Sequence, residues 1–458
     1  MTNKFCRQAA LAVAILALVL ASGCAESTRP QANGKGWIRG INSIVTSPEL
    51  LFRIEERAVG NVNFRGAAGF EEWDGLTYNF NFDLLLPGVQ NDERIATQTV
   101  DVANDIEYTL VLTGTLDNPS IQMWEVPVRE WSGTETVFEA DFIHLSPLLG
   151  QVDVYFAPEG TTPVLGNQVG TLSNGERLPY LELPADDYEL ILTAPGDPSA
   201  VVFQSSPITR APVERVSVAL FDPDPSITAQ VGVNIFFSGG AAQTLADINS
   251  PPIVRTLHAA FGTENFDGYF GEDFGNVIYP NVGFGELSNF DETTEILTPL
   301  TLTAVGNAND VIYEVDLQFI GNTRRTVVLF GEPDGLLEGD LFTRPLLHDG
   351  RPLATFPVVR ITNFSSNIAV LDIYEVDPGT VLDETVFPKF GGTVLALTTG
   401  FFDTPEGLRE FVITRNGEKD PISEPIVLDL ANGDVVDMVI LDTINPSMVE
   451  MRVFETIP

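Results

Sequence analysis

The chain has 458 residues, which is too long for one ordinary hydrophobic core and predicts several domains. Its 24 Lys and Arg residues stand against 64 Asp and Glu residues, and the resulting net charge of −40 argues against nucleic acid and anionic lipid headgroups as partners, because few cations are left to neutralise phosphates. A hydrophobic content of 44% excludes wholesale disorder.

The N-terminus has the layout of an export signal. Two basic residues precede an apolar stretch, Ala9–Leu20, that is too short to be a comfortable membrane span. The next residues, Ala21–Cys24, read ASGC and resemble the lipobox of bacterial lipoproteins. The resemblance implies that the chain is cut before Cys24 and that Cys24 is lipidated. The alternative is an ordinary cleaved signal peptide with a chance cysteine.

We therefore expect a lipoprotein signal peptide over residues 1–23 and a lipidated tether over residues 24–36. Three acyl chains would hold the protein firmly on a membrane. Alanine at position 25 implies, by resemblance to lipoprotein sorting, the outer membrane of a Gram-negative cell, on its periplasmic face or at the cell surface. The other cysteine, Cys6, lies in the segment that is removed, so the mature domains must fold without an internal disulfide.

Beyond the tether, the chain consists of short segments in which apolar and polar residues alternate. Segments such as TYNFNFDLLLPG, YELILTAPG and REFVITRNG are separated by Gly, Pro, Asn and Asp. An alternation with period two, broken by these residues, is typical of β-strands and turns. Convincing amphipathic helices are absent from the sequence, which therefore predicts an all-β fold.

One stretch recurs along the chain and reveals internal repeats. FIHLSPLLGQVDVYF (Phe142–Phe156) is similar to segments at 253–270 and 358–376. In each copy a His or Asn precedes an Asp by nine positions, and the Asp precedes a Tyr by two: His144, Asp153 and Tyr155; His258, Asp267 and Tyr269; Asn363, Asp372 and Tyr374. A divergent copy begins at Trp37, with Asn42 in the His or Asn position and with Leu51 and Arg53 in place of Asp and Tyr.

Other landmarks keep the same order in the copies. Arginine lies three positions before the His or Asn at Arg39, Arg255 and Arg360, and a turn glycine follows a later strand at Gly88, Gly196, Gly306 and Gly417. We predict four tandem immunoglobulin-like β-sandwich modules over residues 37–130, 138–250, 251–345 and 356–458, each with about seven short strands. In the VDVYF strand, Val152, Val154 and Phe156 are expected to face the core, with Asp153 and Tyr155 on the opposite side.

The second copy resembles the tandem bacterial envelope domains of the domain-of-unknown-function family forty-three ninety-seven. It carries the His-Leu-Ser-Pro turn, the VDVY strand, a step made by Gly170 and Ser173, and the turn LPADDYEL at Leu183–Leu190. The third copy keeps Gly285 and Ser288 of that step, and the first and fourth copies depart more. Such modules occur in bacterial lipoproteins and surface proteins and have no established enzymatic role. The resemblance implies a fold and an envelope location, but no reaction.

His144 and Asp153 are the sharpest catalytic candidates, because a histidine oriented by an aspartate can act as a general base. However, the same spacing carries Asn363 in the histidine position, and asparagine takes up no proton at neutral pH. Both side chains can hydrogen-bond a nearby backbone turn, so we expect an architectural role. The chain also has no Gly-x-Ser-x-Gly elbow, phosphate-binding loop or His-Glu-x-x-His run. We expect no enzymatic activity.

Calcium is the metal that the composition favours most, because carboxylates are abundant and the three histidines are far apart. FDPDPS and GEPDGLLEGD lie near module ends and contain the weak candidates Asp222, Asp224, Asp334 and Asp340. Neither segment matches an EF-hand loop. The alternative, which we favour, is that these segments are acidic turns, so no cofactor or metal is assigned.

Aromatic residues gather in two places. All four tryptophans lie in the first copy or just after it, where they either fill a core or form a binding face: Trp37, Trp73, Trp124 and Trp131. The third copy has a long insertion rich in Gly and aromatic residues, whose candidate ligand-binding residues are Phe270, Phe274, Tyr279 and Phe284. Exposed aromatics on a long loop can stack on sugars or hold a peptide.

From the sequence we predict a rod of four modules, lipid-anchored at the outer membrane, with a non-enzymatic role in adhesion or scaffolding. Tandem modules suit this role because several modest surfaces together gain avidity and reach. The partners expected are the membrane, through the lipid, and envelope proteins or glycans. The alternative is a glycan- or peptide-binding lipoprotein that uses the aromatic loop of the third copy.

Overall fold

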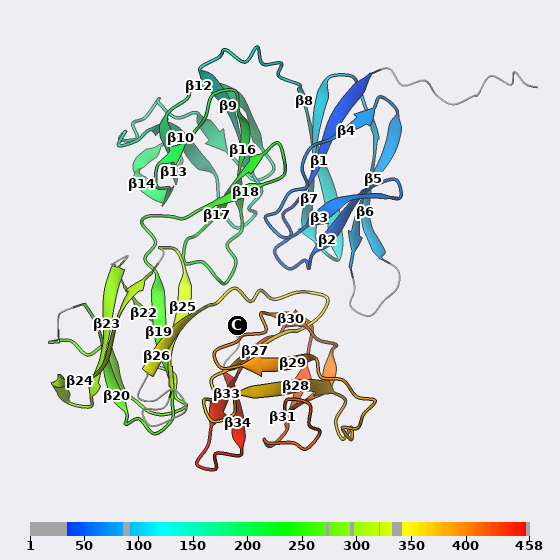
Figure 1. The fold of residues 1–458 in the computed structure, drawn as a ribbon. Coiled ribbons are helices and arrows are strands. Elements are labelled where there is room, and N and C mark those ends of the chain that lie inside the picture. The colour runs from blue at the N-terminus through cyan, green and yellow to red at the C-terminus, as the bar shows by residue number, and fades with distance from the viewer. Residues whose placement is uncertain are drawn as a thin grey trace, which may run out of the picture.

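The computed structural model describes residues 34–85, 92–271, 274–293, 297–319, 321–331 and 341–454. This part of the chain forms β-strands, turns and loops without any helix, which confirms the all-β fold (Figure 1). The described residues therefore contain no helix that is long and apolar enough to cross a membrane. Residues 1–23, for which a signal peptide is expected, and Cys24 lie outside the described residues.

The first unit, residues 35–127, folds into two sheets. Its strands are β1 (Lys35–Asn42), β2 (Leu50–Ile54), β3 (Arg57–Val62), β4 (Glu71–Asp74), β5 (Thr77–Leu84), β6 (Glu93–Asp101), β7 (Ile106–Thr115) and β8 (Asn118–Pro127). One sheet has the order β4–β1–β7–β8 and the other has the order β3–β2–β5–β6.

The second unit, residues 137–245, repeats this plan with added edge strands. Its strands are β9 (Val137–His144), β10 (Val152–Pro158), β11 (Gly170–Leu172), β12 (Arg177–Pro184), β13 (Asp187–Ala194), β14 (Asp197–Gln204), β15 (Ile208–Thr209), β16 (Arg215–Phe221), β17 (Gly232–Phe237) and β18 (Ala242–Leu245). The sheets have the orders β12–β9–β16–β17–β18 and β11–β10–β13–β14, and β15 pairs with β13.

The third unit, residues 253–347, contains β19 (Ile253–Ala260), β20 (Phe266–Phe270), β21 (Tyr279–Val282), β22 (Asp291–Glu292), β23 (Leu297–Ala304), β24 (Asn307–Gln318), β25 (Arg324–Gly331) and β26 (Leu341–Leu347). The fourth unit, residues 358–454, contains β27 (Val358–Asn363), β28 (Val370–Val376), β29 (Phe390–Val394), β30 (Phe402–Asp403), β31 (Gly407–Arg415), β32 (Ile426–Leu430), β33 (Val435–Asp442) and β34 (Val449–Phe454). Their sheets have the orders β22–β19–β25–β26, β21–β20–β23–β24, β30–β27–β33–β34 and β29–β28–β31–β32.

The four units share one topology. In each, the first strand runs parallel to a late strand of the same unit, giving the pairs β1 with β7, β9 with β16, β19 with β25 and β27 with β33. The remaining strand pairs of the described residues are antiparallel. Each unit also encloses its own hydrophobic cluster between its two sheets. As predicted, Val152, Val154 and Phe156 belong to the cluster of the second unit.

The outer faces of the first sheets are covered by neighbouring units, because the units pack in pairs. Along β9, Phe138, Ala140 and Phe142 face the unit's own core, and Ile143 points the other way and is also fully buried. Ile143 joins a second cluster with Ile41 of β1. A corresponding cluster joins the third and fourth units, with members from β19, β25 and β33. The central strands are therefore apolar on both faces, as strands covered on both sides are.

The linker between the third and fourth units returns to the first unit. There the guanidinium of Arg351 donates a hydrogen bond to the carbonyl oxygen of Ser47 at 2.7 Å, and the Ala354 amide donates to the carbonyl of Thr46 at 2.9 Å. The second and third units are joined by Asn322, whose Oδ1 accepts from the amides of Thr228 and Ala229. In Figure 1 the first two units lie above the last two, so the expected rod is wrong and the chain folds back on itself.

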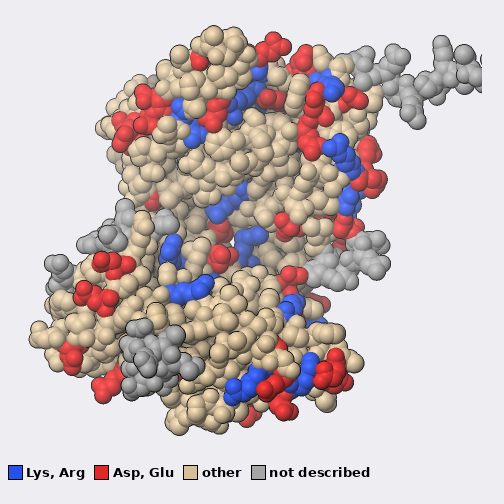
Figure 2. Space-filling view, in the orientation of Figure 1, with Lys and Arg blue, Asp and Glu red and all other residues tan. Residues whose placement is uncertain are grey.

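Charge follows this arrangement. Figure 2 shows Asp and Glu scattered over the outer parts of the molecule and several Lys and Arg near its middle, between the upper and lower units. Arg65 of the first unit is paired with Asp224 of the second at 2.7 Å. Arginines therefore join units in a chain whose net charge is strongly negative.

Candidate functional site

The repeated His and Asn residues hold the backbone of the turn that follows their strand. His144 and His258 each accept a hydrogen bond at Nδ1 from the amide two residues later, at 3.3 Å. Asn42 and Asn363 accept the same bond at Oδ1, at 3.0 and 2.9 Å. All four side chains are fully buried. The position selects a side chain that accepts from this amide, which both residue types can do.

These contacts leave His144 and His258 neutral. Because Nδ1 accepts, the ring proton resides on Nε2, which lies 3.0 Å from the carbonyl oxygen of Gly150 in His144 and 3.2 Å from that of Glu264 in His258. Burial lowers the pKa of both histidines, partly offset by these carbonyls. With both ring nitrogens engaged, neither histidine presents a free lone pair to a substrate.

The repeated aspartates hold a different turn, the one made by the repeated glycines. Oδ2 of Asp153, Asp267 and Asp372 accepts from the amides of Gly196, Gly306 and Gly417 at 2.7, 2.8 and 2.8 Å. The glycines have φ of 73°, 73° and 78°, a left-handed conformation that favours glycine. The second oxygen of Asp153 accepts from the hydroxyl of Thr171 at 2.5 Å. Asp153 thus binds Thr171 and Gly196, and its partners differ from those of His144.

The repeated arginines lie on the outer face of the first sheet. Arg39 and Arg255 each donate through Nε to a threonine on the parallel partner strand, Thr109 and Thr326, at 3.0 Å. Arg360 pairs instead with Asp437 at the equivalent position. Each guanidinium also lies over a phenylalanine ring, at 4.6 Å for Phe70, 4.4 Å for Phe290 and 4.5 Å for Phe401. The arginine landmark is therefore a cation–π contact that the first, third and fourth units share.

The calcium candidates in the described residues have protein partners. Asp222 is 6% exposed and accepts from the Ser146 hydroxyl at 2.5 Å and the Leu148 amide at 3.1 Å. Asp224 pairs with Arg65 and caps the Ser226 amide. Asp334 and Asp340 lie outside the described residues. No group of three or more His, Cys, Asp or Glu in the described part of the chain is placed to hold a metal ion.

The aromatic candidates of the third unit are divided between core and surface. Tyr279 is 1% exposed and donates through its hydroxyl to the Val254 carbonyl at 2.7 Å. Phe270 packs on the same core, and Phe284 packs in the cluster between the third and fourth units. Phe274 is 37% exposed and lies edge-on to Tyr269. The structure does not bring the four rings together on one exposed face.

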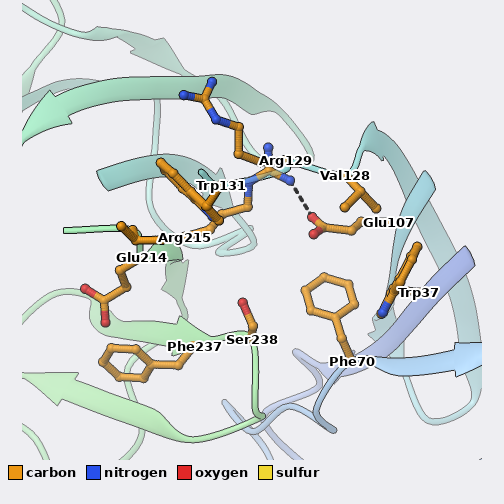
Figure 3. A pocket seen from close by; sticks show the side chains of 11 residues that line it. Trp37, Phe70, Glu107, Val128, Arg129, Trp131, Glu214, Arg215, Phe237 and Ser238 are labelled. Carbon is orange, nitrogen blue, oxygen red and sulfur yellow. Dashed lines mark hydrogen bonds and ion pairs between the residues drawn. The ribbon is translucent and has the colours of Figure 1, made fainter. Parts of the chain in front are cut away.

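A cleft of about 510 Å³ opens between the first and second units (Figure 3). Its aromatic lining comes from four places: Trp37 on β1, Phe70 before β4, Trp131 in the linker after β8, and Phe237 at the end of β17. Figure 3 shows these rings around an opening, with the Glu107–Arg215 ion pair at one side. A cleft of this size with several aromatic walls and a few polar groups has the form of a ligand site.

The charged groups of the cleft are paired with one another. Arg215 binds Glu107 of the first unit at 2.8 Å and Glu139 of its own unit at 2.7 Å. Burial lowers the pKa of Arg215, but these carboxylates and Tyr180 outweigh it and raise the pKa overall. Burial also raises the pKa of Glu107 despite the neighbouring guanidinium. The pair therefore joins the two units at the edge of the cleft.

The linker completes the cleft. Arg129 pairs with Glu182 at 2.8 Å and lies 4.8 Å from the centre of the Trp131 ring, which it holds in place. Burial raises the pKa of nearby Tyr180 to about 12, so its hydroxyl stays protonated. In the sequence, the clustering of tryptophans pointed to this region, but nothing there paired Trp37 and Trp131 with Phe237.

The linker between the third and fourth units begins with a buried histidine. His348 is 3% exposed, contacts the Thr326 hydroxyl at 2.7 Å through Nε2, and lies edge-on to Phe290. Burial is the main cause that lowers the pKa of His348 to about 3, and the nearby charges of Arg255, Arg360 and Arg324 contribute to the same shift. Here the side chain after β26 occupies the space beside the arginine–phenylalanine contact.

Comparison with known proteins adds no identity. No family model matches the chain, and neither does any curated protein. Among solved structures, the chain is similar to one titled "The Bacillus anthracis TIE protein", with 9% identity over 90% of this chain and 69% of that chain, and a TM-score of 0.17.

Proposed function

We propose that the chain is a non-enzymatic envelope lipoprotein whose four immunoglobulin-like units form one folded body for adhesion or scaffolding at the outer membrane. Lipidation of Cys24 would anchor it, and the tether would connect the lipid to the first unit. We also propose that the four units are copies of a repeat that is related to the domain-of-unknown-function family forty-three ninety-seven. Envelope proteins or glycans are the partners proposed.

The proposal is supported by the contacts of the repeated polar residues, which hold backbone turns. His144 and Asp153 formed the best catalytic candidate in the sequence, and each of them is engaged in holding a backbone turn of the fold. Asn42 and Asn363 make the same turn contact without any capacity for proton transfer. A role that depends on shape and surface accounts for these residues better than a reaction does.

The ligand-binding alternative at the third unit has less support. Tyr279 is buried and hydrogen-bonded inside the core, so a ligand reaching this loop would meet mainly Phe274. A deletion of residues 271–278 would separate the two ideas. Binding of a glycan or peptide that is lost with this deletion would favour the alternative, and unchanged binding would favour the scaffold.

The experiment that tests the proposal compares the full chain with its Cys24→Ser variant in a Gram-negative host. We expect the wild-type chain to incorporate labelled fatty acid and to sediment with the outer membrane, and the variant to do neither. Cross-linking and pull-down from intact cells should then recover envelope components with the wild-type chain only. Soluble wild-type protein without label would contradict the anchor. An activity that His144→Asn abolishes in a folded chain would contradict the non-enzymatic role.

A further inference from the structure

We propose that the cleft between the first and second units binds an uncharged oligosaccharide. The cleft is the space bounded by Trp37, Phe70, Trp131 and Phe237 with the Glu107–Arg215 pair. This inference goes beyond the scaffolding role, which needs no such site.

The aromatic walls of the cleft are complementary to a ligand that has flat, partly apolar faces. Trp37 and Trp131 are half-buried, so part of each indole remains accessible to a ligand. Trp37 pairs with Glu107 of β7, and Glu107 pairs with Val126 of β8, so the linker that carries Trp131 leaves the sheet at the same end as Trp37. The two rings line the cleft from different sides (Figure 3). Large rigid aromatic rings offer contact area at low conformational cost, and the C–H faces of pyranose rings are a natural counterpart of such surfaces.

The charges of the cleft argue against ionic ligands. Arg215 is balanced by Glu107 and Glu139, Arg129 is balanced by Glu182, and Glu214 lies 3.5 Å from Arg210. A phosphate, sulfate or carboxylate would have to displace one of these carboxylates from its arginine. The net charge of −40 also repels anions at long range. A cationic ligand would be repelled by the guanidinium groups of Arg129 and Arg215, which line the cleft.

The polar groups of the cleft favour hydroxyls over a proline-rich peptide. Carboxylates accept hydrogen bonds and guanidinium groups donate them, so a ligand lying against Glu107 and Arg215 must do both. A sugar hydroxyl donates and accepts. A proline-rich strand offers carbonyl acceptors for Arg129 and Arg215 but has no N–H at proline, so it could not donate to Glu107 or Glu214.

The corresponding junction of the other pair gives an internal comparison. There His348 turns inward beside Phe290 and is buried. In the first pair the linker places Trp131 at the edge of an open cleft instead. The linker of the first pair thus places an aromatic ring at the cleft, where the linker of the other pair places a buried histidine.

The test is calorimetric titration of the purified full chain, with tryptophan fluorescence as a second readout. The probes are cellohexaose, maltohexaose and N-acetylated chitohexaose, with oligogalacturonate as an anionic comparison and decaproline as a peptide comparison. Two variants alter the cleft: Trp131→Ala removes a wall, and Ser238→Tyr fills the space from an exposed position. Trp73→Phe is the matched control, because Trp73 packs on the core of the first unit and does not line the cleft.

We expect at least one neutral hexasaccharide to bind. Trp131→Ala and Ser238→Tyr should each weaken that binding about tenfold or more, and Trp73→Phe should leave it unchanged. Unfolding of Trp131→Ala would not obscure the result, because Ser238→Tyr removes no packing contact. The inference is overturned if no neutral saccharide binds, if both cleft variants bind as the wild type does, or if decaproline or oligogalacturonate binds in place of the neutral sugars. Because binding is measured on purified protein, failure here would not affect the membrane and pull-down results.

Discussion

Replacing His144 with asparagine and with alanine perturbs one buried ring by different amounts. The ring is fully buried and makes two backbone contacts, to the Ser146 amide and the Gly150 carbonyl. Alanine removes both contacts and leaves the amide of the buried Ser146 without this partner, whereas Gly150 is exposed and its carbonyl can bind water. At about 1–3 kcal/mol for the amide, with the cavity left by the ring in addition, the expected loss is about 3–5 kcal/mol.

Asparagine should cost much less. Its Oδ1 can accept from the Ser146 amide, as Oδ1 of Asn363 does from Ser365 at 2.9 Å in the fourth unit. Only the contact with Gly150 is then lost, for an expected cost of about 1–2 kcal/mol. The difference between the two variants, about 2 kcal/mol, measures the backbone contact that the two residue types share.

Hydrogen exchange of peptides from the second unit is the suitable assay, because a chain of several units need not unfold in a single step. The third unit serves as an internal control, since its protection should not change. Equal losses in the two variants would refute the reasoning, and so would an alanine variant as stable as the wild type.

Three further predictions follow from the structure. Thermal stability should fall as the pH is lowered from 7 to 5, because burial lowers the folded-state pKa of His144, His258 and His348 below 6.5. The contribution of these histidines to stability is present above about pH 6.5 and is lost below it, as the unfolded chain takes up protons that the folded chain does not. Calorimetric scans should show a weaker pH dependence for His348→Gln than for the wild type. Gly196→Ala, at a φ of 73°, should lower the free energy of unfolding in denaturant by about 1–2 kcal/mol. The control Gly150→Ala, at a position with open space, should change it by less than about 0.5 kcal/mol. Equal effects of the two substitutions would contradict the role of Gly196 in the turn. The melting temperature should not change with calcium or chelator, because Asp222 and Asp224 are already engaged, and a clear rise with calcium would show a site that this account lacks.

Much of each unit could be predicted from local patterns. Alternation placed Val152, Val154 and Phe156 in a core, since successive residues of a strand face opposite sides. The substitution of Asn363 for histidine predicted a backbone contact, which the structure contains. The spacing to the turn glycines also carried information, because Asp153 binds the amide of Gly196. These features depend on residues within one unit.

The arrangement of the units could not be predicted in the same way. Ile41 and Ile143 point away from their own cores, and single apolar residues on an outer face are common on protein surfaces. Arg351 reaches the first unit across about three hundred positions of sequence, and no pattern marks its partner. The cleft has the same origin, since Trp37 and Phe237 belong to different units. Long-range pairing of this kind depends on packing, which periodicity does not encode.

The central claim is that the repeated side chains and the joints between units hold four units in one folded body, and small-angle X-ray scattering tests it most directly. The Cys24→Ser chain, which carries no lipid, should give a radius of gyration of about 23–26 Å, near the value for a compact chain of this length. Four units in a line would give roughly 40 Å and a scattering profile typical of a rod, since each unit alone has a radius of gyration of about 13 Å. The compact value would support the joints made by Arg351 and Asn322, and the rod-like profile would contradict them.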